Sequence, residues 1–181
     1  MNTIKKGLGR LSCKVRRFPG KHRVARMFDR LSDQGTSLTV ERLGINWCLT
    51  TKDLIQFSIF YDGSYAGDIT RCINKIVLNS QKSDLIIWDV GANIGSVSLP
   101  VLAGNPNVYI EAFEPAPALI HKLKHNLELN PSVAGRLRLH ELALSDFAGA
   151  AAFYESAQAE NQGIGSLALM GDSQAESIAV A

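Results

Sequence analysis

The sequence predicts an α/β fold built around a parallel sheet, and three observations near the middle of the chain carry this prediction. The first is a nearly unbroken apolar run at Leu85–Val90, typical of a strand that is covered on both faces. The second is a turn containing Gly91 and Gly95, followed by another short strand at Val108–Phe113. The third is Glu114 at the carboxyl end of that strand, where open α/β sheets place their ligands.

Alternating strands and helices continue toward the C-terminus. Apolar spacing predicts a first crossover helix over 94–103 and a second over 115–129, with prolines in the first turn of the second helix. A third strand is predicted over 136–144. The pattern then changes to short strands separated by turns, typical of a small antiparallel insertion, at 150–154, 166–170 and 178–180.

Three sections are expected along the chain. Residues 1–35 form a basic leader of two short helices, residues 36–83 form a lead-in, and residues 84–181 contain the parallel sheet and its β insertion. Punctuation by turn residues such as Gly35 marks the end of the leader.

The lead-in combines β-type and helical patterns. Residues favoured in strands are interrupted by Gly44, which predicts a hairpin or two edge strands over 37–42 and 46–50. Apolar residues recurring at intervals of three and four predict a helix over 68–78. The stretch before that helix, 61–65, reads as a loop.

Charge is distributed unevenly along the chain. Residues 1–30 contain ten Lys and Arg residues and one acid, whereas the remainder has nine bases and sixteen acids. Apolar residues of the leader follow helical spacing, at Ile4, Leu8, Leu11, Val15 and Phe18. Such an arm suits an anionic lipid surface, but charge alone does not select a partner, and a transit peptide, a nucleic-acid arm or solvated helices beside the domain are alternatives. We favour the solvated helices, expect no nucleic-acid partner and keep weak membrane-surface contact as an alternative.

The composition indicates a globular protein without a membrane helix or a secretory signal. No run approaches the roughly 20 apolar residues of a membrane helix, and the start lacks the apolar stretch of a secretory signal. Cys13, Cys48 and Cys72 are an odd number without a CxxC pair, which favours free thiols in a reducing compartment. We therefore expect a cytoplasmic protein.

The glycine turn and the following acid predict a nucleotide-type crevice. Gly91 and Gly95 lack a Cβ and leave room for a ligand, and a helix starting near Ile94 would direct free N–H groups toward an anion. The carboxylate of Glu114 suits the two hydroxyls of a ribose. The GxGxxG pattern of dinucleotide-binding folds is absent, since only GxxxG remains. The alternative is that both glycines serve only the turn and helix packing.

Several motifs resemble those of the FkbM-type methyltransferases, S-adenosylmethionine-dependent enzymes of the Rossmann-like class. The most specific are DVGANIG at 89–95 and FEP at 113–115. The resemblance covers roughly 61–181 and includes YDGSYAGDI at 61–69, Asn126, Asn130, ALSD at 143–146, Gly149 and GIGSL at 163–167. It implies a Rossmann-like class I methyltransferase fold with an incomplete sheet, namely the first three parallel strands plus a small β insertion.

The resemblance also implies roles for individual residues. Glu114 would hold the ribose hydroxyls of S-adenosylmethionine, and Asp89 would lie near the amino group of its methionine part. The residues that would hold the methionine end are Asp89, Gly91, Asn93 and Gly95. Those that would border the adenine are Ala143, Leu144 and Ser145. The acceptor would be a hydroxyl of a sugar or small molecule, and no catalytic residue is assigned.

Members of this family continue beyond the third strand and the insertion into further strands. We therefore expect a truncated form with weak cofactor binding, impaired activity and self-association through the unpaired edge of the first strand. The main alternative is a non-catalytic remnant or interaction module that uses the basic arm. A third, an NAD-linked oxidoreductase, is disfavoured by the broken GxGxxG pattern.

The histidines suggest no metal site. His121 and His125 lie four apart on the predicted second helix, but they share its polar face with lysines and lack an evident third ligand. His140 is expected to be an ordinary strand residue without a group that orients it. No bound metal is predicted.

Overall fold

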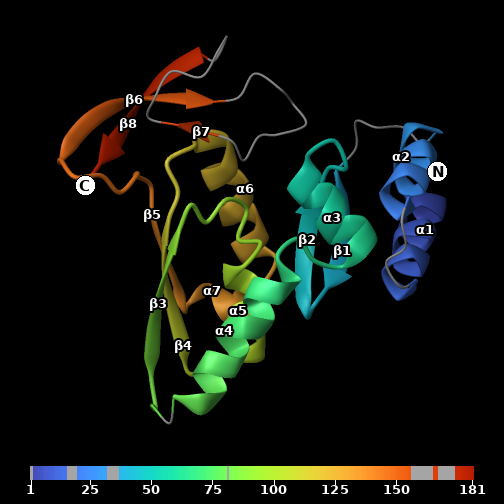
Figure 1. Cartoon of the computed structure of the whole chain (residues 1–181), viewed down its shortest axis with the longest axis horizontal. Coiled ribbons are helices and arrows are strands. Elements are labelled where there is room, and N and C mark those ends of the chain that lie inside the picture. The colour runs from blue at the N-terminus through green and yellow to red at the C-terminus, as the bar shows by residue number, and fades with distance from the viewer. Residues whose placement is uncertain (1, 16–19, 32–36, 81, 156–164, 167–173) are drawn as a thin grey trace.

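The computed structural model describes residues 2–15, 20–31, 37–80, 82–155, 165–166 and 174–181. Three groups of elements follow one another along the chain (Figure 1). Two N-terminal helices lie at one end, and a hairpin with helix α3 (Leu54–Asp62) lies in the middle. A parallel sheet with its helices, joined by helix α4 (Gly67–Asn79), and a small antiparallel sheet form the other end.

The predicted parallel sheet is present. It consists of β3 (Leu85–Val90), β4 (Val108–Phe113) and β5 (Leu137–His140), in the order β3-β4-β5. All pairs are parallel, and the register aligns Val90 with Phe113 and Phe113 with His140. The carboxyl ends of the three strands therefore lie at the same end of the sheet.

The crossover helices are shorter than the sequence predicts. The first, α5, spans Ser98–Gly104 rather than 94–103, because residues 93–97 form turns. The second, α6, spans Pro117–Glu128, and a further short helix, α7 (Pro131–Ala134), was not predicted. The third strand ends at His140 rather than at residue 144.

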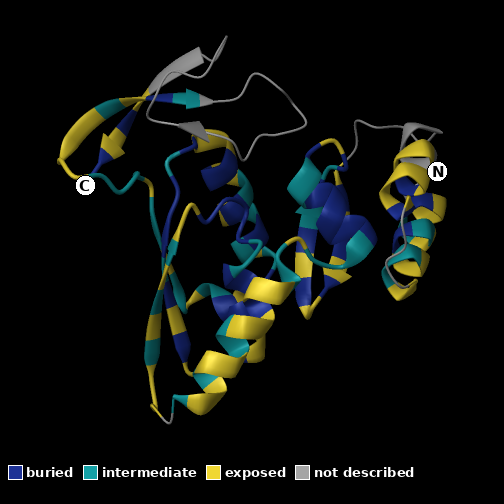
Figure 2. Cartoon of the chain, viewed as in Figure 1, coloured by how far each residue is buried: buried dark blue, intermediate teal, exposed yellow. Residues whose placement is uncertain are grey.

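Helices cover only one face of this sheet among the described residues. In Figure 1, α5, α6 and α7 lie on the same side of β3, β4 and β5. The inward side chains of β4 are buried, whereas Ile86, Trp88 and Val90 of β3 point to the other side and are exposed, Trp88 by 65% (Figure 2). The prediction that this strand is covered on both faces is therefore wrong for the described part of the chain.

The lead-in hairpin is present where it was predicted. Strand β1 (Leu38–Arg42) pairs antiparallel with β2 (Ile45–Leu49), and the turn between them contains Gly44 at φ +74°. Trp47 and Leu49 are buried in the core. The predicted helix after the hairpin is α4 (Gly67–Asn79).

One helix of the lead-in was missed. It is α3 (Leu54–Asp62), which begins at the cap Asp53, whose side chain accepts a hydrogen bond from the N–H of Gln56. Six of its nine residues are buried, so it shows none of the apolar-polar periodicity that identifies a surface helix. Tyr61 and Asp62, predicted to lie in a loop, form its last turn.

The N-terminal leader contains the helices α1 (Asn2–Lys14) and α2 (Lys21–Leu31). Helix α1 packs against α3 at Gly9, where a Cβ would come within 2.5 Å of the Phe60 ring. The buried Lys21 ammonium pairs with Asp62 at 3.1 Å. No described helix is both long enough and apolar enough to cross a lipid bilayer.

The predicted antiparallel insertion is also present. Its strands are β6 (Gly149–Glu155), β7 (Gly165–Ser166) and β8 (Gln174–Val180), in the order β7-β6-β8. The expected strand at 166–170 falls mostly outside the described residues. The end of β8 returns to the parallel sheet, since Val180 bridges to Ala143 just beyond β5.

Candidate functional site

The turn after β3 is left-handed at three alternating positions. Gly91 has φ +81°, Asn93 has φ +54° and Gly95 has φ +85°. Glycine adopts this conformation without the steric penalty of a Cβ, and asparagine tolerates it better than most other residues. The sequence GANIG therefore encodes the reversal that brings the chain from the end of β3 toward α5.

The two glycines of the turn have different surroundings. A Cβ added at Gly95 would lie 2.8 Å from Cδ1 of Leu123 and 2.9 Å from Cγ of Leu99, so this glycine lets the turn pack against α6. A Cβ added at Gly91 would meet no atom within 4 Å. Gly91 is exposed and open to a ligand, while Gly95 serves packing.

The backbone donors of the turn are bonded within the chain. The N–H groups of Gly91 and Ala92 both donate to the Phe113 carbonyl, at 2.8 and 3.0 Å, and the N–H of Gly95 donates to the Ala92 carbonyl. The predicted anion cradle at the start of a helix near residue 94 is therefore wrong. Helix α5 begins four residues later, after the turn has satisfied these donors internally.

Glu114 lies directly against this turn. Its Oε2 accepts a hydrogen bond from the N–H of Asn93 at 2.7 Å, and its Oε1 accepts one from the N–H of Ala116 at 3.0 Å. The residue is 4% exposed. Through these two bonds the acid holds the turn in place.

Asp89 is the second acid at this edge of the sheet. It is the penultimate residue of β3, is half-buried, and accepts a hydrogen bond from the hydroxyl of the fully buried Ser98. Burial raises the pKa of Asp89 above its ordinary value, and the hydrogen bonds from Ser98 oppose that shift. A desolvated carboxylate of this kind favours a cationic partner.

The residues predicted to border the adenine lie just beyond β5. The N–H groups of Ala143 and Ser145 donate to the carbonyls of Ala179 and Ala181, at 3.0 and 2.9 Å. Leu144 is half-buried between them. These backbone donors are engaged by the end of β8, so any contact with a base here would come from side chains and carbonyl groups.

Two asparagines connect this site to the lead-in hairpin. The Asn126 amide donates to the Ile94 carbonyl at 3.1 Å and accepts from the N–H of Cys48 at 3.0 Å. Asn130 makes a similar pair of bonds to the backbone of Asn46, at 2.9 and 2.7 Å. Both asparagines are buried. The hairpin thus supports the turn through α6.

His140 has the orienting partner that the sequence did not reveal. Its Nε2 lies 2.6 Å from Oε2 of Glu111, and its ring stacks on Phe113 with centroids 4.6 Å apart and planes at 12°. The interpretation of His140 as an unoriented strand residue is therefore wrong. Only the register of β4 with β5 could have revealed that Glu111 and His140 share the uncovered face of the sheet.

The described residues contain no group of three or more metal-ligating side chains. On α6, His125 pairs with Glu128 at 3.3 Å, in the same helix.

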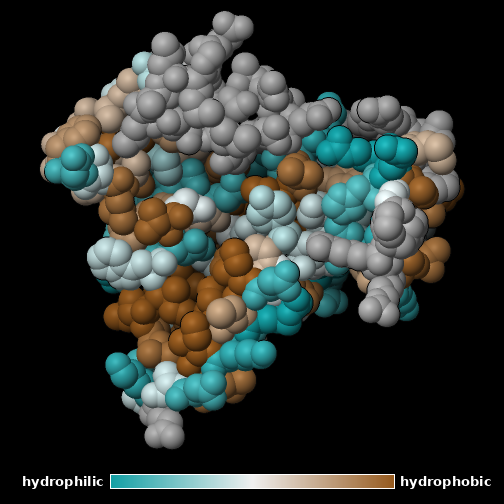
Figure 3. All heavy atoms as spheres, viewed as in Figure 1, coloured by the Kyte–Doolittle hydropathy of each residue, from teal (hydrophilic) through white to brown (hydrophobic). Residues whose placement is uncertain are grey.

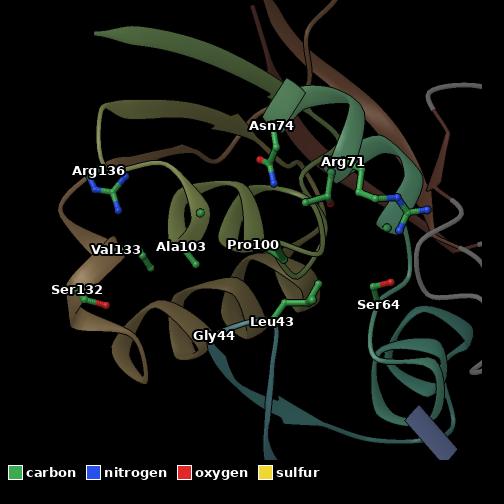
Figure 4. A pocket seen from close by; sticks show the side chains of 13 residues that line it. Leu43, Gly44, Ser64, Arg71, Asn74, Pro100, Ala103, Ser132, Val133 and Arg136 are labelled. Atoms are coloured by element: carbon green, nitrogen blue, oxygen red, sulfur yellow. The ribbon is translucent and has the colours of Figure 1, made fainter. Parts of the chain in front are cut away.

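One cavity lies away from the glycine turn, lined by residues of α4, α5, α7 and the turn of the hairpin. It encloses about 510 Å³ beside the segments that lead into β4 and β5 (Figure 4). The Arg136 guanidinium at its wall donates to three backbone carbonyls at the end of α5 and the start of β4. A smaller cavity of about 380 Å³ adjoins the candidate site, lined by Pro115, Glu141 and residues of β8. The position of a cavity relative to Gly91 and Glu114 indicates the ligand site better than the volume of the cavity does.

Comparisons with known proteins find similarity to methyltransferases. No protein-family model matches the chain. The chain is 42% identical over 67 residues to the methyltransferase sdnD of Sordaria araneosa. This matched segment covers 37% of this chain and 26% of that protein. It is 38% identical over 79 residues to the 31-O-demethyl-FK506 methyltransferase FkbM of Streptomyces tacrolimicus. This matched segment covers 44% of this chain and 29% of that protein.

These two relatives confirm the resemblance to methyltransferases, the FkbM type included, over the matched segments. The matched segments amount to less than a third of the length of either relative. Among solved structures, that of P. horikoshii TYW2 in complex with MeSAdo aligns with a TM-score of 0.48 and 22% identity, over 72% of this chain and 51% of that one.

Proposed function

We propose that this chain carries the S-adenosylmethionine-binding part of a methyltransferase that acts on a hydroxyl oxygen of a small molecule or sugar. The observation that carries this proposal is the contact of Glu114 with the turn at Asn93, in a turn that begins at the open Gly91. Asp89, a second acid, comes two residues before Gly91 at the end of β3. Identity to two methyltransferases supports the reaction class. One of them acts on an O-demethyl compound, which favours an oxygen acceptor.

The residues around the turn fit this cofactor in two respects. The open space at Gly91 admits a ligand close to the backbone, and the half-buried Asp89 carboxylate suits a positively charged amino group. Glu114 would border the ribose, and Asn93 and Gly95 would shape the turn beneath the methionine end. Ala143, Leu144 and Ser145 would border the adenine from beyond β5.

The chemistry of the transfer resides in the cofactor. S-adenosylmethionine supplies a methyl group already activated on its sulfonium. The chain therefore has to bind and orient the cofactor, a task suited to carboxylates held at the ends of two neighbouring strands.

We expect this chain alone to bind the cofactor weakly and to show impaired methyl transfer. The backbone donors of residues 91–95, and those of Ala143 and Ser145, are bonded within the chain, so they offer few hydrogen bonds to a ligand. Binding would depend mainly on the two acids.

Titration of the ¹⁵N-labelled chain, followed by NMR, tests the proposal at weak affinity. S-adenosylmethionine should shift the amide signals of Gly91, Asn93 and Gly95, with a dissociation constant weaker than micromolar, while NAD at the same concentration should not. Glu114→Ala should remove these shifts, and Glu128→Ala on an exposed face of α6 should preserve them. Equal shifts with NAD, or shifts that survive Glu114→Ala, would reject the site.

A second candidate is a non-catalytic interaction module. It is favoured by the exposed apolar and basic side chains of α1 and α2, which lie away from the glycine turn. If S-adenosylmethionine shifts no amide signal of the turn at millimolar concentration, the methyltransferase proposal fails and the interaction module is the favoured function.

A further inference from the structure

Helix α1 packs against the rest of the protein through its small and polar side. Lys5 Nζ donates to Thr51 Oγ1 at 2.8 Å, and the Cys13 thiol donates to the Phe60 carbonyl at 3.4 Å. Between them, Gly9 lies directly against the Phe60 ring. These three residues follow a spacing of four, so they lie along one side of the helix.

The apolar side of α1 points elsewhere. Ile4, Leu8, Leu11 and Val15 are also spaced by three and four, but they form a separate stripe, in which Ile4 is 70% and Leu11 is 61% exposed. An amphipathic helix of a globular protein ordinarily turns its apolar stripe to the core. Here the close approach that Gly9 permits brings the opposite side to the core instead.

Helix α2 extends the apolar stripe. Val24 and Met27 are exposed on α2, and an open groove of about 190 Å³ between the helices is lined by side chains that include Leu8, Leu11 and Val24. We call this surface the α1–α2 apolar face. Figure 2 shows the exposed positions along both helices, which lie at the end of the molecule opposite the parallel sheet. Contiguous apolar surface of this kind marks an interaction site.

Basic side chains flank this face. Arg10 and Lys14 of α1 and Arg23 of α2 are exposed. Residues 1–30 carry ten Lys and Arg residues and one acid, while the rest of the chain has nine bases and sixteen acids. An apolar stripe bordered by cations matches a surface that offers acyl chains and phosphates together, which is the boundary of an anionic lipid bilayer. A nucleic-acid partner would account for the basic side chains but not for the exposed apolar stripe.

We infer that the α1–α2 apolar face docks on an anionic membrane surface. Its apolar side chains enter the boundary between headgroups and acyl chains, and its basic side chains meet the lipid phosphates. The acidic remainder of the chain is repelled by the same surface, so the protein binds through this end. This docking is independent of cofactor binding and goes beyond the proposed methyl transfer.

Sedimentation with lipid vesicles tests the inference. The full chain should co-sediment with vesicles of 70% phosphatidylcholine and 30% phosphatidylglycerol and remain in solution with pure phosphatidylcholine. Because each basic residue near the surface contributes about 1 kcal/mol, the double variant Arg10→Gln/Lys14→Gln should bind roughly 25-fold more weakly. Leu11→Ser should weaken binding roughly tenfold by removing an inserted side chain.

Matched variants on another helix separate this face from general charge and hydrophobicity. Lys75→Gln and Ile76→Ser change exposed residues of α4 and should leave vesicle binding unchanged. Far-ultraviolet circular dichroism should show that all variants keep the fold, since every substituted residue is exposed. Binding to phosphatidylcholine alone with equal affinity, or equal losses in the α4 variants, would overturn the inference. So would a change in oligomeric state caused by Leu11→Ser without vesicles, which would indicate a second copy on this face.

Discussion

The carboxylate of Glu114 accepts a hydrogen bond from the backbone N–H of Asn93 at 2.7 Å. This bond joins the end of β4 to the left-handed turn that follows β3, and the second oxygen of the same carboxylate holds the start of the segment leading into α6. One side chain thus fixes the relative position of three segments that converge at the candidate site. Its removal should affect both the fold and ligand binding.

Glu114→Gln should destabilise the chain by about 1–3 kcal/mol. A glutamine offers one accepting oxygen, so its NH₂ group would face either the N–H of Asn93 or that of Ala116 and leave it unpaired in a buried place. Urea unfolding measures this loss. Glu128→Gln, at an exposed position of α6, serves as the control. A stability equal to that of the natural sequence would contradict the role of Glu114 in fixing the turn.

Asp89→Asn should change the pH dependence of stability. Burial raises the pKa of Asp89, so the folded chain binds its proton more tightly than the unfolded chain. The contribution of this group is therefore most favourable below the ordinary aspartate pKa of 3.8 and is lost as pH rises through the raised folded-state pKa. Urea unfolding at several pH values should show the variant gaining stability relative to the natural sequence as pH rises from 3.5 to 7.

The same variant separates stability from ligand binding. The amide oxygen of asparagine can still accept the Ser98 hydroxyl, so the fold should persist while the charge for a cationic ligand is gone. Ser98→Ala provides a comparison, because it removes the hydrogen bond that opposes the rise in the pKa of Asp89. A difference in stability that does not vary with pH would show that Asp89 is not desolvated.

Gly91→Ala and Gly95→Ala should differ in their effects. Both place an alanine at positive φ, which costs roughly 1–2 kcal/mol. At Gly95 the new Cβ also meets Leu123 and Leu99 at 2.8 and 2.9 Å, which adds roughly 1–3 kcal/mol of overpacking. Thermal unfolding should therefore rank Gly95→Ala as the less stable variant. Gly91→Ala should instead weaken ligand binding, because its methyl group projects into the open space.

Parallel strands and motifs could be predicted from the sequence because local patterns encode them. The alternation of apolar runs with helical spacing located β3, β4 and α6, and the position of Glu114 after its strand placed it near the turn. Helix α3 escaped this reasoning because it is buried on nearly all sides and lacks a polar face. The pairing of Glu111 with His140 escaped it because their proximity depends on strand register, which no local pattern contains.

The start of α5 shows a further limit of local patterns. Ile94 continues the apolar spacing of the helix, yet the hydrogen bonds of residues 91–93 to Phe113 and Glu114 hold this stretch in turns. These partners are about twenty residues distant. The turn therefore lacks the free donors that the sequence predicted, which shifts the expected ligand contacts to Asp89 and Glu114.

Asn126→Ala should destabilise the chain by about 1–3 kcal/mol for each buried group that it leaves unpaired. Those groups are the carbonyl of Ile94 and the N–H of Cys48, which the Asn126 amide now joins. Because Ile94 lies in the glycine turn, the variant should also broaden the NMR signals of Gly91 and Gly95. Asn79→Ala, at an exposed position on α4, is the matched control. Unchanged turn signals would show that the hairpin does not support the site.

Trp88→Arg should reduce self-association of the chain. Trp88 lies with Ile86 and Val90 on the uncovered face of β3, and the outer edge of this strand has no partner among the described residues. Figure 3 shows apolar side chains gathered between β3 and α4. Exposed apolar surface beside an open strand edge promotes pairing of chains.

Sedimentation velocity over a range of concentrations measures this association. The natural sequence should show an apparent mass that rises with concentration, and Trp88→Arg should shift that rise to at least about tenfold higher concentration, as expected if one large side chain contributes over 1.4 kcal/mol to the contact. Phe147→Arg replaces an exposed aromatic residue outside the strands of the sheet and should behave like the natural sequence. Both variants add the same charge, so a mass that falls equally in both would assign the effect to net charge rather than to the face of β3. A natural chain that stays monomeric throughout would show that neither this face nor the edge of β3 drives association.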